Sequence, residues 1–197
     1  MAFVSVITDD QASGKAAEFF ESDRASLGFV ANYSRVLANR PAMFEGWGRL
    51  IGGIKSTMDP RRYELVTLAA ATRLRSSYCA LAHGKVLLDN YYGASDLTKI
   101  ALDRGSGQLD EADVAVMNLA EKIVDDAGSV TQAEMDRLRE LGLTDPEIID
   151  VVVTTAARCF FSKTLDALGV QADSTYADMD PELRDALTVG RPIAMPA

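Results

Sequence analysis

The chain has 197 residues, of which 48% are hydrophobic and 25% are charged, the balance of an ordinary globular protein. Its formal net charge of −9 argues against nucleic acid and anionic membranes, because both need clustered lysine and arginine. No apolar run approaches the roughly 20 residues of a membrane span, and the acidic N-terminus lacks the pattern of a signal peptide. Two cysteines are too few for a disulfide scaffold, so we expect a cytoplasmic protein with reduced thiols.

Helix-capping signals recur along the sequence and predict an all-α fold. A proline follows an N-cap aspartate at Asp59 and again at Asp145, and Thr131–Glu134 is a capping box. No stretch alternates apolar and polar residues long enough for a strand, and the β-prone run Val151–Thr155 lies inside an expected helix. The expected helices span residues 11–25, 32–38, 41–57, 60–75, 77–92, 95–104, 110–127, 131–141, 146–168 and 180–188.

The two halves of the chain resemble each other at a spacing of 86 residues. At this spacing Glu64 lines up with Asp150. Ser76 likewise lines up with Ser162. One interpretation is a duplicated helical unit of which only the first copy kept reactive groups. The other is chance similarity between two amphipathic helices that both start with proline.

The duplication predicts one domain that is built from two related parts. We expect a single domain over residues 1–197, with a first unit of about 1–105 and a second, degenerate unit of about 106–197. The segment Gly105–Gln108 is rich in glycine and serves as the expected linker between them.

One constellation in the sequence has the composition of a reactive site. His83 is the only histidine, and it lies four residues after Cys79, so the two share one face of a helix. An imidazole beside a thiol can take or hold the thiol proton. Ser76 and Ser77 are good N-cap residues, which places Cys79 in the first helical turn, where the helix dipole favours thiolate.

Glu64, on the preceding helix, is the expected partner of His83. It lies roughly 15 Å before the end of its helix, and His83 lies about 9 Å into the next one. An antiparallel pair therefore brings the carboxylate nearer to His83 than to Cys79, where it would orient the imidazole. Alternatively Cys79 only packs in the core, since cysteine is among the most buried residue types. No metal is expected, because one histidine and one cysteine do not form a zinc ligand set.

The spacing of these residues resembles the core motif of the alkylhydroperoxidase D (AhpD) and carboxymuconolactone decarboxylase family, in its peroxidase-related branch. That motif is a glutamate, eleven residues, and then Cys-x-x-Cys-x-x-x-His, which here falls on Glu64, Ser76, Cys79 and His83. The resemblance is specific between Asp59 and Gly93 and looser elsewhere. It implies an AhpD-like multihelical fold with two related helical units and a homo-oligomer, such as a dimer or a hexamer.

The resemblance also implies a function and roles for these residues. Cys79 would attack the peroxide, and His83 and Glu64 would serve the proton relay. Ser76 replaces the resolving cysteine, so the sulfenic acid would need an external thiol reductant. Ser76 and Tyr78 would be polar groups behind the site, and no cofactor is implied. The predicted function is reduction of hydrogen peroxide or small organic hydroperoxides through one peroxidatic cysteine, in antioxidant defence.

Two other functions stay open at this point. One is an acid–base enzyme such as a lactone decarboxylase, in which Glu64 and His83 move protons. Arg73 or Arg75 would then hold a substrate carboxylate, and Cys79 would only line the pocket. The other is a non-catalytic helical oligomer that binds a small apolar ligand or a partner protein. Fast modification of Cys79 below about pH 8 would distinguish the peroxidase from both.

Overall fold

The computed structural model describes residues 2–103 and 109–195. Ten α-helices form these parts of the chain: α1 (Lys15–Leu27), α2 (Asn32–Leu37), α3 (Pro41–Lys55), α4 (Pro60–Arg73), α5 (Ser77–Asn90), α6 (Ala94–Leu102), α7 (Glu111–Asp126), α8 (Gln132–Glu140), α9 (Asp145–Ala167) and α10 (Pro181–Leu187). No strand occurs in the described ranges, so the all-α prediction is confirmed, and Val151–Thr155 is helical. The expected linker Gly105–Gln108 lies outside the described residues.

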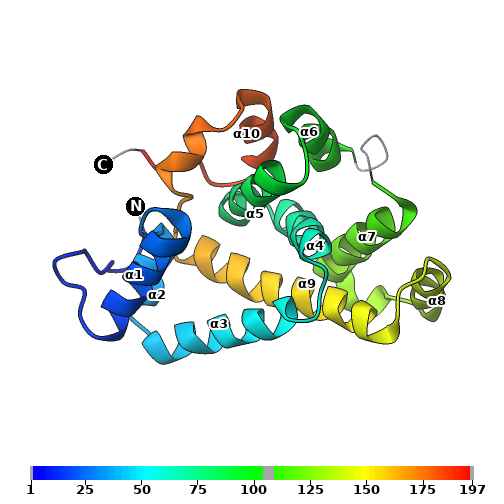
Figure 1. The fold of residues 1–197 in the computed structure, drawn as a ribbon, viewed down its shortest axis with the longest axis horizontal. Helices are drawn as coiled ribbons and strands as arrows, with labels where there is room; N and C mark the ends of the chain where they lie inside the picture. Colours follow the sequence, from blue (N-terminus) through cyan, green and yellow to red (C-terminus); the bar gives the residue numbers. More distant parts are fainter. Residues whose placement is uncertain (1, 104–108, 196–197) are drawn as a thin grey trace.

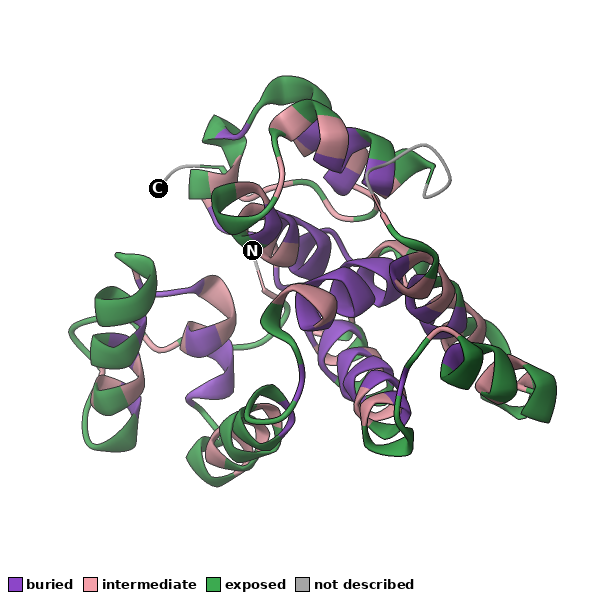
Figure 2. Ribbon diagram, turned by 45° about the vertical axis from the view of Figure 1, so that its right-hand side comes forward, coloured by how far each residue is buried: buried purple, intermediate pink, exposed green. Residues whose placement is uncertain are grey.

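Helix α4 lies at the centre of the molecule and contacts α5, α7 and α9 (Figure 1). Its residues from Tyr63 to Ala71 are all buried, which Figure 2 shows as a nearly continuous purple helix. A helix buried on every side needs apolar residues on every side, and this run supplies them. The one ionisable carboxylate in this run, Glu64, is therefore a buried charge that requires partners.

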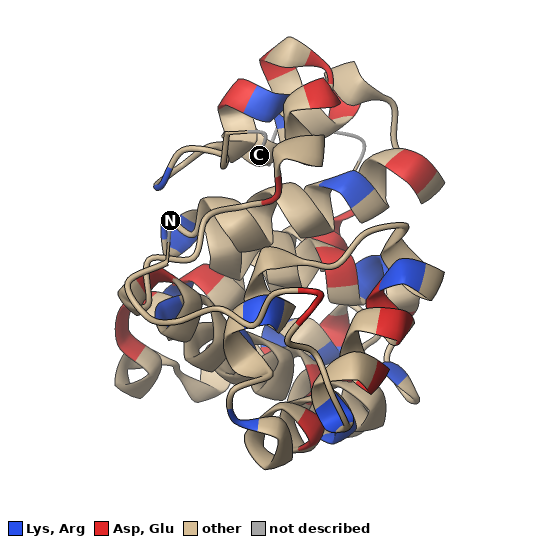
Figure 3. Ribbon diagram, turned by 90° about the vertical axis from the view of Figure 1, so that its left-hand side faces the viewer, with Lys and Arg blue, Asp and Glu red and all other residues tan. Residues whose placement is uncertain are grey.

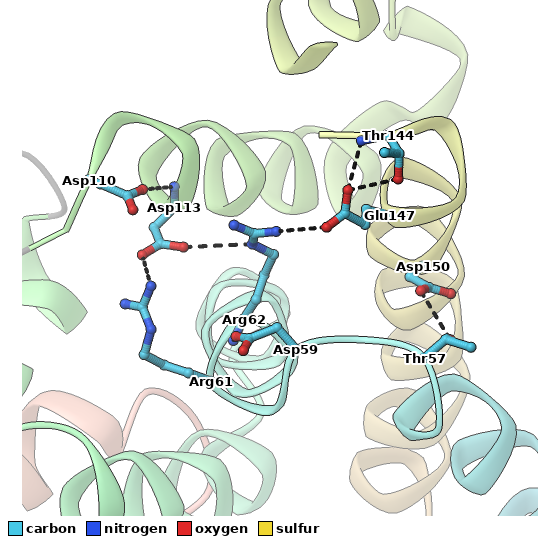
Figure 4. Close-up of polar contacts among 9 residues, drawn as sticks. All are labelled: Thr57, Asp59, Arg61, Arg62, Asp110, Asp113, Thr144, Glu147 and Asp150. Atoms are coloured by element: carbon cyan, nitrogen blue, oxygen red, sulfur yellow. Dashed lines mark hydrogen bonds and ion pairs between the residues drawn. The ribbon is translucent and has the colours of Figure 1, made fainter. Parts of the chain in front are cut away.

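Ion pairs fix the N-terminus of α4 against two neighbouring helices (Figure 4). The fully buried carboxylate of Asp113 on α7 lies 2.5 Å from Nη2 of Arg61 and 3.8 Å from Nε of Arg62. Arg62 also reaches Glu147 at the start of α9, at 3.7 Å. Asp59 caps α4 as predicted, accepting a 2.8 Å hydrogen bond from the backbone N–H of Arg62.

The helical conformation is interrupted between α4, which ends at Arg73, and α5, which begins at Ser77, and we refer to this interruption as the break. Arg75 has a φ of 58°, and it is the only non-glycine residue with positive φ in the described ranges. The C-terminal segment packs into the break, where the N–H of Gly190 donates a 2.7 Å hydrogen bond to Oγ of Ser77. A Cβ at Gly190 would collide with the carbonyl oxygen of Arg75, so only glycine fits there.

Helices α1, α2 and α3 form a separate layer at one side of the bundle (Figure 1). This layer is more exposed than the centre, and α3 buries only Ile54 completely (Figure 2). Its main contact with the bundle is between α3 and α9. The rings of Trp47 on α3 and Phe161 on α9 stack there, with centroids 4.5 Å apart and planes 9° from parallel. This contact brings aromatic side chains from two distant parts of the sequence together.

Basic and acidic residues are interspersed on the face that Figure 3 presents. Many of them pair with one another, as in Lys15 with Glu18 and Arg35 with Asp9. Among the described helices, none is long and apolar enough to cross a membrane.

Candidate functional site

A pocket of about 270 Å³ opens between α3, α4, α5 and α9. Four of the residues singled out from the sequence line it: Glu64, Tyr78, Cys79 and His83. Ser76 does not. Its side chain is fully buried behind the start of α5, where it interacts with Asp166. Ser76 holds the N-cap position of α5 as predicted, although its side chain makes no capping hydrogen bond.

Cys79 is a free thiol in the first turn of α5, with a relative exposure of 2%. This placement follows from the break at Arg75, because α5 starts only two residues before Cys79. The sulfur therefore lies near the positive end of the helix dipole, as expected from the sequence. Its recorded hydrogen-bond partner is Nη1 of Arg158, at 3.4 Å.

Arg158 is the functional candidate that sequence reasoning missed. It comes from α9, is 3% exposed, and donates through Nη2 to the hydroxyl of Tyr63 at 3.4 Å. Among the described residues, Nε of Arg158 has no hydrogen-bond partner and the guanidinium takes part in no ion pair. Instead its guanidinium lies 5.9 Å from the ring centroid of Trp47 and 5.6 Å from that of Phe161. A signal existed: Arg158 is the one charged residue between Val151 and Phe161.

Buried Glu64 and partly buried His83 form a pair on the same pocket. Nδ1 of His83 donates to Oε2 of Glu64 at 2.5 Å, and Nζ of Lys55 lies 3.3 Å from Oε1. The contact expected between Glu64 and His83 is thus present. Burial alone would raise the pKa of Glu64, but His83 and Lys55 hold it below its usual value. Burial and the positive charge of Arg158 lower the pKa of His83, so the imidazole is neutral and Nε2 is its proton acceptor.

Charged side chains from three helices meet at the pocket: Lys55 from α3, Glu64 from α4 and Arg158 from α9. Lys55 is half exposed and pairs with Glu64. The buried guanidinium of Arg158 lies 3.4 Å from the sulfur of Cys79. A cysteine next to a positively charged group is the arrangement in which reactive thiols are found.

Tyr78 connects the pocket to the C-terminal part of the chain. Its hydroxyl donates to Oδ2 of Asp173 and accepts a 3.4 Å hydrogen bond from the backbone N–H of Tyr33. Burial, followed by the nearby charge of Asp173, raises the pKa of Tyr78 well above its usual value. Burial also raises the pKa of Tyr33 to about 12. Both tyrosines are neutral at physiological pH and present ring surface to the pocket.

Three other candidates lie away from this pocket. Arg73 pairs with Asp125 on the surface at 2.6 Å, and Nε of Arg75 donates to the carbonyl of Val189 at 3.3 Å. Neither arginine can hold a substrate carboxylate beside Glu64, so that part of the acid–base alternative was wrong. Cys159 is a free, partly buried thiol on α9 that does not line the pocket, and burial raises its pKa.

Known structures share this fold. An alkylhydroperoxidase AhpD core, an uncharacterized peroxidase-related protein from Ralstonia eutropha JMP134, matches with a TM-score of 0.81 and 19% identity over 89% of this chain and 94% of that chain. A peroxidase-related protein from Silicibacter sp. TM1040 matches with a TM-score of 0.79 and 17% identity, over 88% and 94%. No family model matches the sequence, and no curated protein matches it.

A further match has a different activity. The debrominase Bmp8, as a cysteine-to-alanine variant in complex with 2,3,4-tribromopyrrole, matches with a TM-score of 0.74 and 14% identity, over 93% of this chain and 95% of that chain. At such identities the likeness establishes the fold alone. The debrominase also shows that this fold is not restricted to one activity.

Proposed function

We propose, with the AhpD-like helical fold of the chain as premise, that it is a thiol-dependent peroxidase with Cys79 as its single peroxidatic cysteine. The substrates are hydrogen peroxide or small organic hydroperoxides, and the physiological role is antioxidant defence. His83 and Glu64 form the proton relay, and Ser76 and Tyr78 are supporting polar groups. No cofactor enters the reaction.

One observation carries the proposal: the buried guanidinium of Arg158 lies 3.4 Å from the sulfur of Cys79 and, among the described residues, forms no ion pair with a carboxylate. The thiolate is the nucleophile in peroxide reduction, and a buried thiol needs a neighbouring positive charge to ionise. Arg158 supplies that charge permanently, because a guanidinium does not lose its proton in proteins. The same cation stabilises the negative charge that develops on the leaving oxygen.

The chemical step follows from this geometry. The thiolate of Cys79 attacks the terminal oxygen of ROOH, so that an S–O bond forms while the O–O bond breaks. The products are the sulfenic acid of Cys79 and the anion RO⁻. The proton lost by the thiol, or an equivalent one from water, reaches RO⁻ through Nε2 of His83. Glu64 keeps the imidazole in the required tautomer by accepting from Nδ1.

Regeneration requires an external thiol, since Ser76 cannot form a disulfide. One equivalent of R′SH condenses with the sulfenic acid to give a mixed disulfide and water. A second equivalent displaces the thiol of Cys79 and leaves R′SSR′. Small thiols are abundant in the cytoplasm, which is where we place the protein.

Mass spectrometry of the intact protein tests the function directly. After a brief exposure to peroxide, we expect one added oxygen atom on Cys79 and none on Cys159. Addition of a small thiol should remove that oxygen and consume peroxide repeatedly. If Cys79 gains no oxygen at concentrations that oxidise free cysteine, the peroxidase proposal is wrong, and the acid–base enzyme or the ligand-binding oligomer takes its place.

We also propose that the protein is a homo-oligomer, a dimer or a hexamer. Several large apolar side chains stay exposed: Leu27 and Val86 on the pocket lining, and Leu50 and Phe160 outside it. About half of the Phe160 side chain is exposed to solvent beside Trp47. Exposed apolar side chains of this kind are typical of surfaces that bind another protein. Light scattering at micromolar protein should give a mass above that of one chain, and a monomeric mass would refute the assembly.

A further inference from the structure

We infer that the pocket selects a neutral substrate built on a single aromatic ring. If the proposed function is correct, the substrate is a hydroperoxide that carries an aromatic ring. The inference rests on the proposed function only for the hydroperoxide group. Binding of the ring itself does not depend on peroxide chemistry. The two can therefore be tested separately.

Six of the fifteen residues that line the pocket have aromatic side chains, and these come from separate elements. Phe161 contacts two of the other rings: Trp47 stacks on it, and the ring of Tyr33 meets it edge to face, with centroids 5.5 Å apart. Tyr63 and Tyr176 add two further rings to the lining. Offset and edge-to-face contacts with aromatic rings favour an aromatic ligand over a saturated one of equal size.

The size of the pocket limits the ligand to one ring. Its volume of about 270 Å³ lies just below the range of roughly 300–1,000 Å³ that holds drug-sized molecules. A benzene ring with a short side chain fits such a space. The side chain then lies toward Cys79, where the O–O bond breaks as described above and the ring leaves as an alcohol.

The charge of the pocket selects a neutral ligand. When Cys79 is a thiolate, it pairs with Arg158, and Glu64 pairs with Lys55. An anionic ligand would place an extra negative charge beside the thiolate in a region of low dielectric constant. A Cys79→Ser substitution removes the thiolate and leaves Arg158 without a counter-ion, so this variant should prefer an anion.

The single tryptophan of the chain, Trp47, reports binding directly. We would titrate the reduced wild-type protein with benzyl alcohol and with cyclohexylmethanol at pH 8, and follow Trp47 fluorescence. Benzyl alcohol should bind about threefold to tenfold more tightly, the usual gain from aromatic contacts. Equal affinity for both alcohols, or no binding of benzyl alcohol, would overturn the inference.

Two variants on neighbouring positions of α9 locate the effect. Phe161→Leu should remove the preference for benzyl alcohol over cyclohexylmethanol, because Phe161 lies in the pocket wall. Phe160→Leu is the matched control: Phe160 is 51% exposed and does not line the pocket, so the preference should persist. If both variants, or neither of them, lost the preference for benzyl alcohol, the aromatic ring of the ligand would not bind against Phe161, and the inference would be contradicted.

Benzoate tests the charge selection. The wild-type protein should bind benzoate on the order of tenfold more weakly than benzyl alcohol, and Cys79→Ser should reverse that order. Cys159→Ser should behave like the wild type. Preference for benzoate in the wild-type protein would overturn the neutral-ligand part. Ring binding without any oxidation of Cys79 by peroxide would instead refute the proposed function and leave this inference standing.

Discussion

Helix α9 runs unbroken for 23 residues, whereas the segment that lines up with it at a spacing of 86 residues is divided into α4 and α5. Both begin with an aspartate and a proline, and both carry a serine near the same point, Ser76 in one and Ser162 in the other. Both serines are fully buried. The segments differ at the break: Arg75 is left-handed, while the matching positions in α9 stay helical.

The break and the continuous helix contribute different parts of the site. The break creates a helix N-terminus inside the protein and puts the sulfur of Cys79 in its first turn. The continuous helix holds Arg158 and Phe161 on one rigid element that packs against α4. The proposed reactive pair therefore takes its thiol from one segment and its cation from the other. Whether the segments descend from one duplicated unit stays a prediction, which a superposition of α4 on α9 with their neighbouring helices would test.

The largest expected effect comes from removing the thiol that the break presents. Cys79→Ser should abolish the consumption of peroxide coupled to small-thiol oxidation, because no other thiol lies in the pocket. Cys159→Ser is the matched control on the unbroken helix and should keep the wild-type rate. A coupled assay with a small thiol and cumene hydroperoxide measures both. Loss of activity in Cys159→Ser at unchanged thermal stability would mean that the wrong cysteine has been assigned.

The second effect comes from the cation on the unbroken helix. Arg158→Gln should slow the reaction about a hundredfold, since one buried charged donor to a reacting atom is typically worth that much. It should also move the pH midpoint of Cys79 alkylation by iodoacetamide upward. Arg158→Lys should have a rate between those of the wild type and Arg158→Gln. Its ammonium group keeps the positive charge but cannot contact both the sulfur of Cys79 and the hydroxyl of Tyr63, as the two nitrogens of the guanidinium do. Arg73→Gln, on an exposed ion pair, should change nothing.

Substitutions in the proton relay, His83 and Glu64, should slow the reaction less than substitution of Arg158. His83→Gln should slow peroxide reduction about tenfold, below the usual range for general acid–base catalysis, because water can also protonate a small leaving group. Since the sulfur contacts Arg158, the alkylation midpoint should stay near its wild-type pH. Glu64→Gln should slow the reaction by a smaller factor, because the amide oxygen of the new side chain would still accept from Nδ1. If His83→Gln moved the alkylation midpoint as far as Arg158→Gln does, the imidazole would be the group that holds the thiolate.

Much of the fold could be predicted because its signals are local. The cap at Asp59 and the capping box at Thr131 act within four residues, and both helices begin where these signals place them. The four-residue spacing of Cys79 and His83 likewise fixes their common helix face. Arg158 could not be predicted in this way, because it reaches Cys79 across 79 residues through the packing of separate helices. The same limit applies to Ser77, whose hydroxyl is occupied by the distant C-terminal segment.

The smallest expected effect concerns stability, at the position where α5 has His83 and the matching site after α9 has Gly169. Folding lowers the pKa of His83 below its usual 6.5, so the native state binds the proton less readily than the unfolded state. The stability due to His83 is therefore complete above about pH 6.5 and is lost as the pH falls below it. Because the chain has one histidine, a comparison with His83→Gln isolates this contribution.

The comparison should be made by urea unfolding at pH 7 and at pH 5.5. On going to the lower pH, the wild-type protein should lose more stability than His83→Gln, by at most about 1.4 kcal/mol for each pH unit below pH 6.5. Aspartates whose pKa is raised by burial, such as Asp23 and Asp173, are present in both proteins and cancel in the difference. In the wild-type protein, the lowered pKa of Glu64 acts only below about pH 4.5, outside this window. Parallel losses in the two proteins would mean that His83 takes up a proton in the folded state as easily as in the unfolded one, and that it serves the relay as an imidazolium.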